Sequence, residues 1–323
     1  MAKPLAIEEQ VAALHKLRAD PQSDATRDAL SKALSARSNL LVAKAAQLAG
    51  ELRLTDLLPN LHKAFGRFFA DGSDKGCVAK SAIAEACESL QSDDEALFLR
   101  GVRHVQMEGA WGGSIDVAVS LRATCARALS RLNTRNALPA LTDLLGDAEA
   151  PARAAAAQAI GHVGRAEGAL PLRLKIRTGD AEPAVMAESF AALLKILGDD
   201  AIALIEPFLS SATPELREAA ATALGESRLA AAYHLLRARF DREITVDARH
   251  PLLLGMALSR HPESLQFLLQ IIDDEPSPTA AHAVEALAIY RNDPAVTAQV
   301  AALVKSRNDD AVSAAFTKRF SQR

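Results

Sequence analysis

The sequence predicts an all-α fold, an α-α superhelix in which about eight to nine helix pairs stack as a solenoid. Apolar residues make up 49 % of the 323 residues and aromatic residues only 4 %, which favours alanine-rich helices that pack closely. Val, Ile and Thr never cluster with the two-residue alternation of a strand, so no strand is predicted. One helix pair also recurs along the chain with an almost constant period, which indicates a repeat array.

The stretch PARAAAAQAIGHVG, residues 151–164, represents the repeating unit: a helix and a glycine, followed by another helix over residues 169–177. In the second helix of each pair an apolar residue precedes a position that is usually small. This position recurs with an almost constant spacing, at Ser130, Gly161, Leu193, Gly225, Ala257 and Ala288. A small side chain at a fixed place lets neighbouring helices approach closely, and only Leu193 departs from the pattern. A repeat array has no single core to outgrow, so the chain is expected to form one solenoid over residues 1–323.

The periodicity also gives the order of the elements. Residues 1–23 are expected to form an N-terminal capping helix that ends at Asp20-Pro21, since proline cannot continue a helix. Helix pairs are expected at residues 26–36 with 39–52, 55–69 with 76–90, and 95–107 with 115–132. Downstream, first helices are expected at residues 137–145, 169–177, 201–209 and 265–272. Residues 104–121 are longer than the matching segments and form a Gly-rich insertion within a repeat.

The second helices follow a pattern of proline, arginine, an alanine run and an apolar-small step, as in Pro151, Arg153 and Ile160-Gly161. This pattern resembles HEAT repeats, and the short period is similar to that of the HEAT-like repeats in phycobilisome-lyase-type proteins. The resemblance extends from about residue 24 to the end. It implies a HEAT/armadillo-type solenoid and leaves the function open, because one fold hosts many functions.

A ladder of basic residues lies seven positions before the apolar residue of the step, at Lys80, Arg122, Arg153, Arg217 and Arg249. Acidic residues lie six positions before four of them, at Asp74, Asp116, Asp147 and Glu243. The HEAT resemblance implies that such acid–base pairs tie adjacent repeats together. A stripe of cationic side chains that binds a ligand is the alternative.

The insertion HVQMEGAWGGSIDVAVSL, residues 104–121, contains three glycines within five residues and the sole tryptophan, Trp111. Tryptophan is enriched at binding hot spots, so Trp111 in a long surface loop is a candidate contact with a partner. Alternatively, Trp111 folds back and fills a gap between repeats. The candidate partner-binding residues are Arg103, His104, Glu108, Trp111 and Arg122.

Chemistry-bearing motifs are sparse. Three cysteines lie in apolar helical patterns and are expected to be buried free thiols, in keeping with a reducing compartment: Cys77, Cys87 and Cys125. His250, His261 and His282 fall in neighbouring second-helix regions, but no two of them are three or four positions apart, and the chain has no His-Glu pair. No metal site, cofactor or catalytic residue is therefore predicted.

Charge limits the partners. The net charge is −3, with 19 basic and 19 acidic residues in residues 1–160 and 18 and 21 in residues 161–323. Neither half is basic enough for the phosphate contacts that dominate nucleic-acid affinity, so no nucleic acid is expected. The N-terminus holds no long apolar run, so neither a signal peptide nor a membrane span is expected, and the protein is expected to be cytoplasmic.

These observations favour a non-catalytic scaffold or adaptor that binds a protein or peptide partner on the concave face of the solenoid. Two alternatives stay open. The repeat length, through the resemblance, suggests a chaperone or lyase for phycobilin attachment. A DNA-repair glycosylase on a HEAT-like solenoid is the other, although it requires a basic groove that the even charge does not provide.

Overall fold

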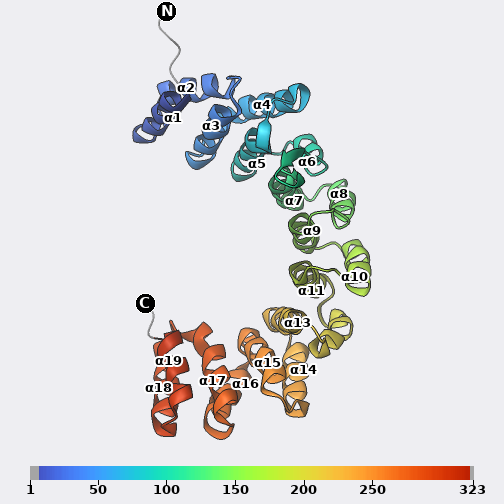
Figure 1. Cartoon of the computed structure of the whole chain (residues 1–323), viewed down its shortest axis with the longest axis vertical. Helices are drawn as coiled ribbons and strands as arrows, with labels where there is room; N and C mark the ends of the chain where they lie inside the picture. The colour runs from blue at the N-terminus through green and yellow to red at the C-terminus, as the bar shows by residue number, and fades with distance from the viewer. Residues whose placement is uncertain (1–6, 321–323) are drawn as a thin grey trace, which may run out of the picture. The chain divides into compact units, whose positions relative to one another are not determined.

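The computed structural model describes residues 7–320 and divides the chain into two compact units, unit 1 (Met1–Val163) and unit 2 (Gly164–Arg323). Each unit is built from consecutive pairs of helices, so the predicted all-α solenoid is confirmed (Figure 1). None of the helices within the described range is long and apolar enough to cross a membrane.

The described part of unit 1 consists of a first helix, α1 (Ile7–Lys16), and four helix pairs. The pairs are α2 (Asp24–Leu34) with α3 (Asn39–Glu51), α4 (Leu58–Asp71) with α5 (Val78–Ser89), α6 (Glu95–Gly101) with α7 (Val119–Leu132), and α8 (Ala137–Leu144) with α9 (Ala150–Val163). The second helices pack in sequence, α3 on α5, α5 on α7 and α7 on α9, and form one row (Figure 1). Within the segment predicted to cap the array, α1 packs on α3 and buries Leu14, while residues 1–6 lie outside the described residues.

Unit 2 adds five pairs within its described residues, which brings the chain to nine and agrees with the prediction. They are α10 (Ala169–Thr178) with α11 (Pro183–Leu197), α12 (Ile202–Ile205) with α13 (Pro214–Glu226), α14 (Ala230–Arg242) with α15 (Val246–Ser259), α16 (Pro262–Asp274) with α17 (Ser277–Leu287), and α18 (Pro294–Arg307) with α19 (Asp310–Phe320). The helix predicted over residues 201–209 is instead split between α12 and the 3-10 turn Glu206–Ser210. Pro207 explains the break, because it has no N–H to donate to the preceding turn.

Small residues in the second helices allow very close packing in unit 2. A Cβ atom added to Gly225 on α13 would lie 2.2 Å from the carbonyl oxygen of Gly255 on α15. A Cβ atom added to Gly255 would lie 2.5 Å from the carbonyl oxygen of Ala221. The two backbones are therefore in direct contact, as the recurring small residue at the Leu224-Gly225 step predicts.

One pair departs from the regular pattern. The helix α6 ends at Gly101 and α7 begins at Val119. The prediction that residues 102–107 and 115–118 are helical was therefore wrong. The connecting segment 102–118 is more than three times as long as the segment 145–149 that joins α8 to α9. It contains the antiparallel strands β1 (Met107–Ala110) and β2 (Gly113–Asp116).

The prediction that the chain has no strand was thus wrong at this hairpin. Both strands are short, and glycine and polar residues occupy much of them, so the usual alternation of β-branched residues is missing. The last residues of the predicted insertion, 119–121, belong to α7 instead, where Leu121 is fully buried.

Candidate functional site

The hairpin arm (residues 105–117) lies in the turn that joins α6 to α7. Met107 pairs with Asp116 and Ala110 with Gly113, which leaves Trp111 and Gly112 as a two-residue loop. Gly112 has a φ of +90°, a left-handed conformation that glycine adopts without steric cost. The backbone pairing continues toward the helices, where the Val117 amide donates to the Gln106 carbonyl oxygen at 2.9 Å. A tight turn therefore fixes the position of Trp111.

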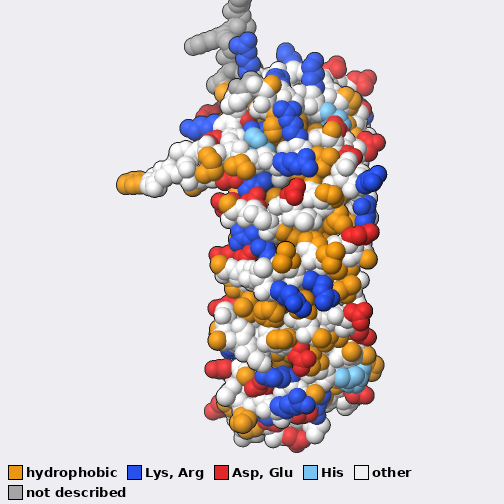
Figure 2. All heavy atoms as spheres, turned by 90° about the vertical axis from the view of Figure 1, so that its right-hand side faces the viewer, with side chains coloured by type: hydrophobic (Ala, Val, Ile, Leu, Met, Phe, Trp, Pro, Cys, Tyr) orange, Lys and Arg blue, Asp and Glu red, His pale blue; other side chains and the backbone are white. Residues whose placement is uncertain are grey.

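Trp111 is fully exposed, with 105 % of its reference surface accessible. Val105, Met107 and Ile115 on the same arm are each more than half exposed. Figure 2 shows the hairpin as an arm that projects from the helices, with hydrophobic side chains at its end. The alternative in which Trp111 fills a gap between repeats is therefore wrong.

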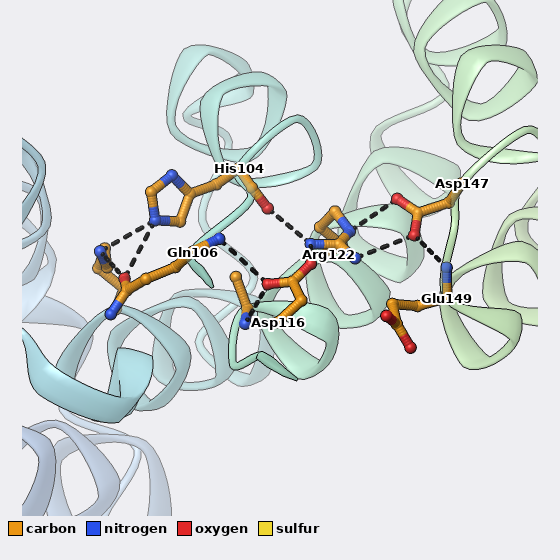
Figure 3. A network of polar contacts seen from close by, with 8 residues as sticks. His104, Gln106, Asp116, Arg122, Asp147 and Glu149 are labelled. Atoms are coloured by element: carbon orange, nitrogen blue, oxygen red, sulfur yellow. Dashed lines mark hydrogen bonds and ion pairs between the residues drawn. The ribbon is translucent and has the colours of Figure 1, made fainter. Parts of the chain in front are cut away.

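A buried ionic network holds the base of the arm (Figure 3). The Arg122 side chain on α7 is only 2 % exposed and donates from Nη1 to Oδ2 of Asp116 at 2.6 Å and to the carbonyl oxygen of His104 at 2.8 Å. Its Nη2 donates to Oδ1 of Asp147 at 2.9 Å, and its Nε lies 2.9 Å from Oδ2. Asp116 also accepts the amides of Gln106 and Ala118. Arg122 thus ties β2 and the segment that leads into β1 to α7 and, through Asp147, to the next repeat.

A second set of contacts holds β1 against the preceding repeat. Gln106 Nε2 donates to the carbonyl oxygen of Asp74 at 2.7 Å and to Oε1 of Glu108 at 2.6 Å. The same Glu108 oxygen accepts the Gly76 amide at 2.6 Å. Lys80 Nζ donates to Oε1 of Gln106 at 2.5 Å. The base of the arm is therefore held on both sides, while its tip stays free of the helices.

An aromatic and cationic cluster lies beside this base. The Phe69 ring packs against the His104 ring with their centroids 4.5 Å apart. The Arg100 guanidinium lies 4.2 Å and the Lys80 ammonium 5.1 Å from the centroid of Phe69. Burial, together with the charge of Lys80, outweighs the hydrogen bond to the side-chain oxygen of Gln106 and holds the pKa of His104 below its usual range. His104 is therefore neutral near pH 7 and suited to packing beside a cation.

The acidic groups of the arm are held in their ionised forms. Burial alone would raise the pKa of Asp116, but the Ala118 and Gln106 amides and the Arg122 guanidinium outweigh it, so that pKa lies below its usual range. Hydrogen bonds from the Gly76 amide and the Gln106 side chain likewise lower the pKa of Glu108. Asp116 and Glu108 therefore act as fixed anions at the base of the arm and have no proton to exchange at neutral pH.

The basic ladder makes a different set of contacts from the one expected. Its links run forward to the next repeat, from Arg122 to Asp147, from Arg249 to Glu275 at 2.8 Å, and from Lys80 to Gln106. Within the same repeat, three arginines donate to the backbone carbonyl six positions earlier, Arg153 to Asp147, Arg217 to Ser211 and Arg249 to Glu243.

In several repeats, the carboxylate six positions before the ladder residue therefore binds other donors. The Asp74 carboxylate accepts the amides of Ala79 and Lys80 at the start of α5, and that of Glu243 pairs with Arg239. The Asp147 carboxylate, six positions before Arg153, pairs with Arg122 of the preceding repeat. Asp116 with Arg122 is the pair found as predicted.

The remaining predicted residues fall in separate places. Arg103 is exposed in the turn that leads to β1. The three thiols are free and buried, as predicted. Burial raises the pKa of Cys77 to about 11 and that of Cys87 to about 12, and it raises the pKa of Cys125 as well. None of the three therefore forms the reactive thiolate at neutral pH.

One cluster in unit 2 is missing from the sequence-based predictions. The rings of His250 on α15 and His282 on α17 are stacked with their centroids 4.1 Å apart, and Glu285 lies beside them. Neither a spacing of three or four positions nor an adjacent His-Glu pair signals this contact. The signal that could have found it is the repeat period, because the two histidines are one period apart in the sequence.

No protein-family model matches the chain, and no curated protein matches it. Among solved structures, the complex of CpcE and CpcF of phycocyanin lyase from Nostoc sp. PCC7120 is similar at 19 % identity, with a TM-score of 0.36 and coverage of 97 % of this chain and 96 % of that chain. Kap121p bound to RanGTP is similar at 12 % identity, with a TM-score of 0.48 and coverage of 98 % and 41 %. Human deoxyhypusine hydroxylase is similar at 15 % identity, with a TM-score of 0.31 and coverage of 89 % and 98 %. The consecutive helix pairs and their almost constant period give this chain the fold of a HEAT-repeat protein.

Proposed function

We propose that the chain is a non-catalytic protein-binding scaffold and that the hairpin arm is its contact with a protein or peptide partner. The observation that supports this proposal is the fully exposed Trp111 at the end of an arm whose base is held by buried ion pairs. A large aromatic side chain in water loses the hydrophobic stabilisation that burial would give. An exposed tryptophan on an ordered support is thus suited to burial in a partner.

The size of the expected effect follows from the indole. A tryptophan that becomes buried removes about 150–250 Å² from water. At about 25 cal/mol per Å² this corresponds to about 4–6 kcal/mol before the costs of association. The tight turn and the anchored base already restrict the arm, so little conformational entropy is lost when it binds. Met107 and Ile115 are also exposed, on opposite faces of the hairpin, so the arm offers apolar side chains besides the indole.

The test compares two single substitutions that each remove an exposed apolar side chain. Trp111→Ala changes the arm, and Ile244→Ala is the matched control, since Ile244 is 90 % exposed and lies outside the arm. Partners retained from native lysate by the unaltered protein are purified, and their affinities for all three proteins are measured by calorimetry. Trp111→Ala should weaken binding at least about 30-fold, the effect of a hot-spot residue, whereas Ile244→Ala should change it little.

Circular dichroism and thermal melting of the same proteins establish that both variants are folded. Partners that bind all three proteins equally well would show that the arm is not the contact surface. A direct partner should also shift the fluorescence emission of Trp111 to shorter wavelength, because binding would move the indole out of water.

A further inference from the structure

Two histidines and a glutamate meet on neighbouring helices of unit 2. His250 Nε2 on α15 lies 4.0 Å from Oε2 of Glu285 on α17, and the His250 and His282 rings are stacked at 4.1 Å. One possible ligand atom from each of the three residues lies within 4.8 Å of the other two. These side chains have no part in the hairpin arm, which belongs to unit 1.

The repeat itself creates this cluster. His250 and His282 are separated by one repeat period and occupy equivalent positions on α15 and α17, which pack against each other. Equivalent residues of adjacent second helices are therefore neighbours. Glu285 follows His282 by three positions and so shares its helix face. Glu218 lies one period before His250, so a carboxylate continues the same line.

The surroundings include acidic side chains and an unpaired nitrogen. A pocket of about 280 Å³ beside His250 is lined by two carboxylates, Glu218 and Asp247, and by one cation, Arg217. Among the described residues, the buried Nδ1 atom of His282 has no hydrogen-bond partner. An unpaired buried nitrogen is costly unless something binds its lone pair.

We propose that His250, His282 and Glu285 bind a divalent first-row transition-metal ion, of which zinc is the simplest probe. Two imidazoles and a carboxylate are a ligand set that suits zinc and leaves a fourth position for water. Ligand bonds of about 2.0–2.2 Å require the three atoms to approach one another by roughly 1 Å. They also require the stacked His250 and His282 rings to turn so that their in-plane lone pairs converge on one point. Arg319 Nε lies 3.5 Å from Oε1 of Glu285, so Oε2 remains directed to His250.

The experiment uses the full chain without a histidine tag. Equilibrium dialysis against micromolar zinc, followed by metal analysis, should find one bound zinc per chain. His282→Ala and Glu285→Gln should each weaken zinc binding at least about tenfold. The matched control is His162→Ala, which removes an exposed histidine of unit 1 and should leave the affinity unchanged.

Thermal melting gives a second readout. Zinc that binds the folded chain raises its melting temperature by mass action, and this rise should be lost in both site variants and kept in the control. Glu285→Gln preserves the size of the side chain, so it remains informative even where His282→Ala fails to fold. The absence of stoichiometric zinc on the unaltered protein, or zinc binding that survives both substitutions, would overturn the proposal.

Discussion

Trp111 and Arg122 have opposite environments in the hairpin arm. Arg122 is buried and contacts two carboxylates and a carbonyl, whereas Trp111 is fully exposed. A buried guanidinium that loses a partner is strongly destabilising. Loss of either carboxylate, Asp116 or Asp147, would therefore weaken the whole network around Arg122. Stability of the arm therefore resides at its base, and its exposed surface is free for a partner.

The exposure of Trp111 predicts its fluorescence. As the sole tryptophan, it reports on the arm alone, and its emission should be that of an indole in water with full access to acrylamide. Trp111→Ala should change the free energy of unfolding by no more than about 0.5 kcal/mol, because surface substitutions remove few contacts. Steady-state quenching and urea unfolding check both expectations. An emission at short wavelength that resists quenching would show that the indole packs against the protein.

Asp116 predicts how stability depends on pH. Its folded pKa lies below the ordinary value of 3.8, so its stabilising effect is complete above that value and is lost as the pH falls through the folded pKa. Asp116→Asn should lower the free energy of unfolding by about 2 kcal/mol at pH 7, since a hydrogen bond to a charge is lost. The variant should then lose less stability on acidification than the unaltered protein.

Urea unfolding at neutral and acidic pH measures the effect of Asp116→Asn. Asp241→Asn is the control, because Asp241 pairs with Arg237 on the surface and is 57 % exposed. An exposed pair of this kind contributes less than about 1 kcal/mol. Equal effects of the two substitutions would show that Asp116 is not part of a buried network.

At this scale the sequence indicates some residues and conceals others. Trp111 is conspicuous as the sole tryptophan in a Gly-rich segment, but its exposure could not be predicted, because a surface loop and a gap-filling loop have the same composition. The contact of His250 with His282 depends on the packing of α15 on α17. Spacings within one helix therefore do not reveal it, while the repeat period does.

Among the elements, the helix pairs follow from the sequence and the hairpin does not. Apolar periodicity and turn-forming residues place most helices close to their observed bounds, as in the predicted helix 39–52 and the observed α3. The strands β1 and β2 are held mainly by backbone pairing and by contacts at their base, which leave little trace in the pattern of side chains. A segment of two short strands with glycine at the turn therefore resembles an irregular loop in the sequence.

The close approach of α13 and α15 predicts a contrast between two glycines. Gly255→Ala should destabilise the protein by about 2 kcal/mol or more, because the new methyl group would meet the carbonyl oxygen of Ala221 at 2.5 Å. Gly66→Ala on α4 is the matched control, since no atom lies within 4 Å of the added Cβ. This control should be neutral or stabilising by up to about 1 kcal/mol, because alanine favours the helix. Thermal melting compares them, and similar losses would contradict the close packing.

For the molecule as a whole, the basic ladder links consecutive repeats within each unit by ion pairs. Links from Arg122 to Asp147 in unit 1 and from Arg249 to Glu275 in unit 2 join one repeat to the next. In such arrays stability is approximately a sum of repeat and interface terms, so unfolding need not be a single transition. The period of the sequence predicts this stacking, although the forward direction of the links could not be derived from the acid–arginine spacing alone.

All three cysteines lie in unit 1, so the reaction rate of their thiols reports on the packing of that unit. The buried thiols, with their raised pKa values, should resist a disulfide reagent in the native protein and react fully in urea. Ile244→Cys supplies the control, because a thiol at this exposed position of unit 2 should react at once. Measured reaction rates near those of the control would show that unit 1 opens readily, against the packing described.

The position of the hairpin within its repeat predicts that the arm can be grafted into another helix-to-helix turn of the chain. Asp116 precedes Arg122 by six positions, as Asp147 precedes Arg153, so the arm ends at the same sequence position relative to the second helix as an ordinary short turn. In both repeats the arginine binds this aspartate, through its carboxylate in Asp116 and through its backbone carbonyl in Asp147. The turn between two helices can therefore lengthen without any change in how those helices stack. Loop grafting of residues 102–118 into the turn 145–149 would then give a chain with two arms, and replacement of the arm by a turn of the ordinary length would give one with none.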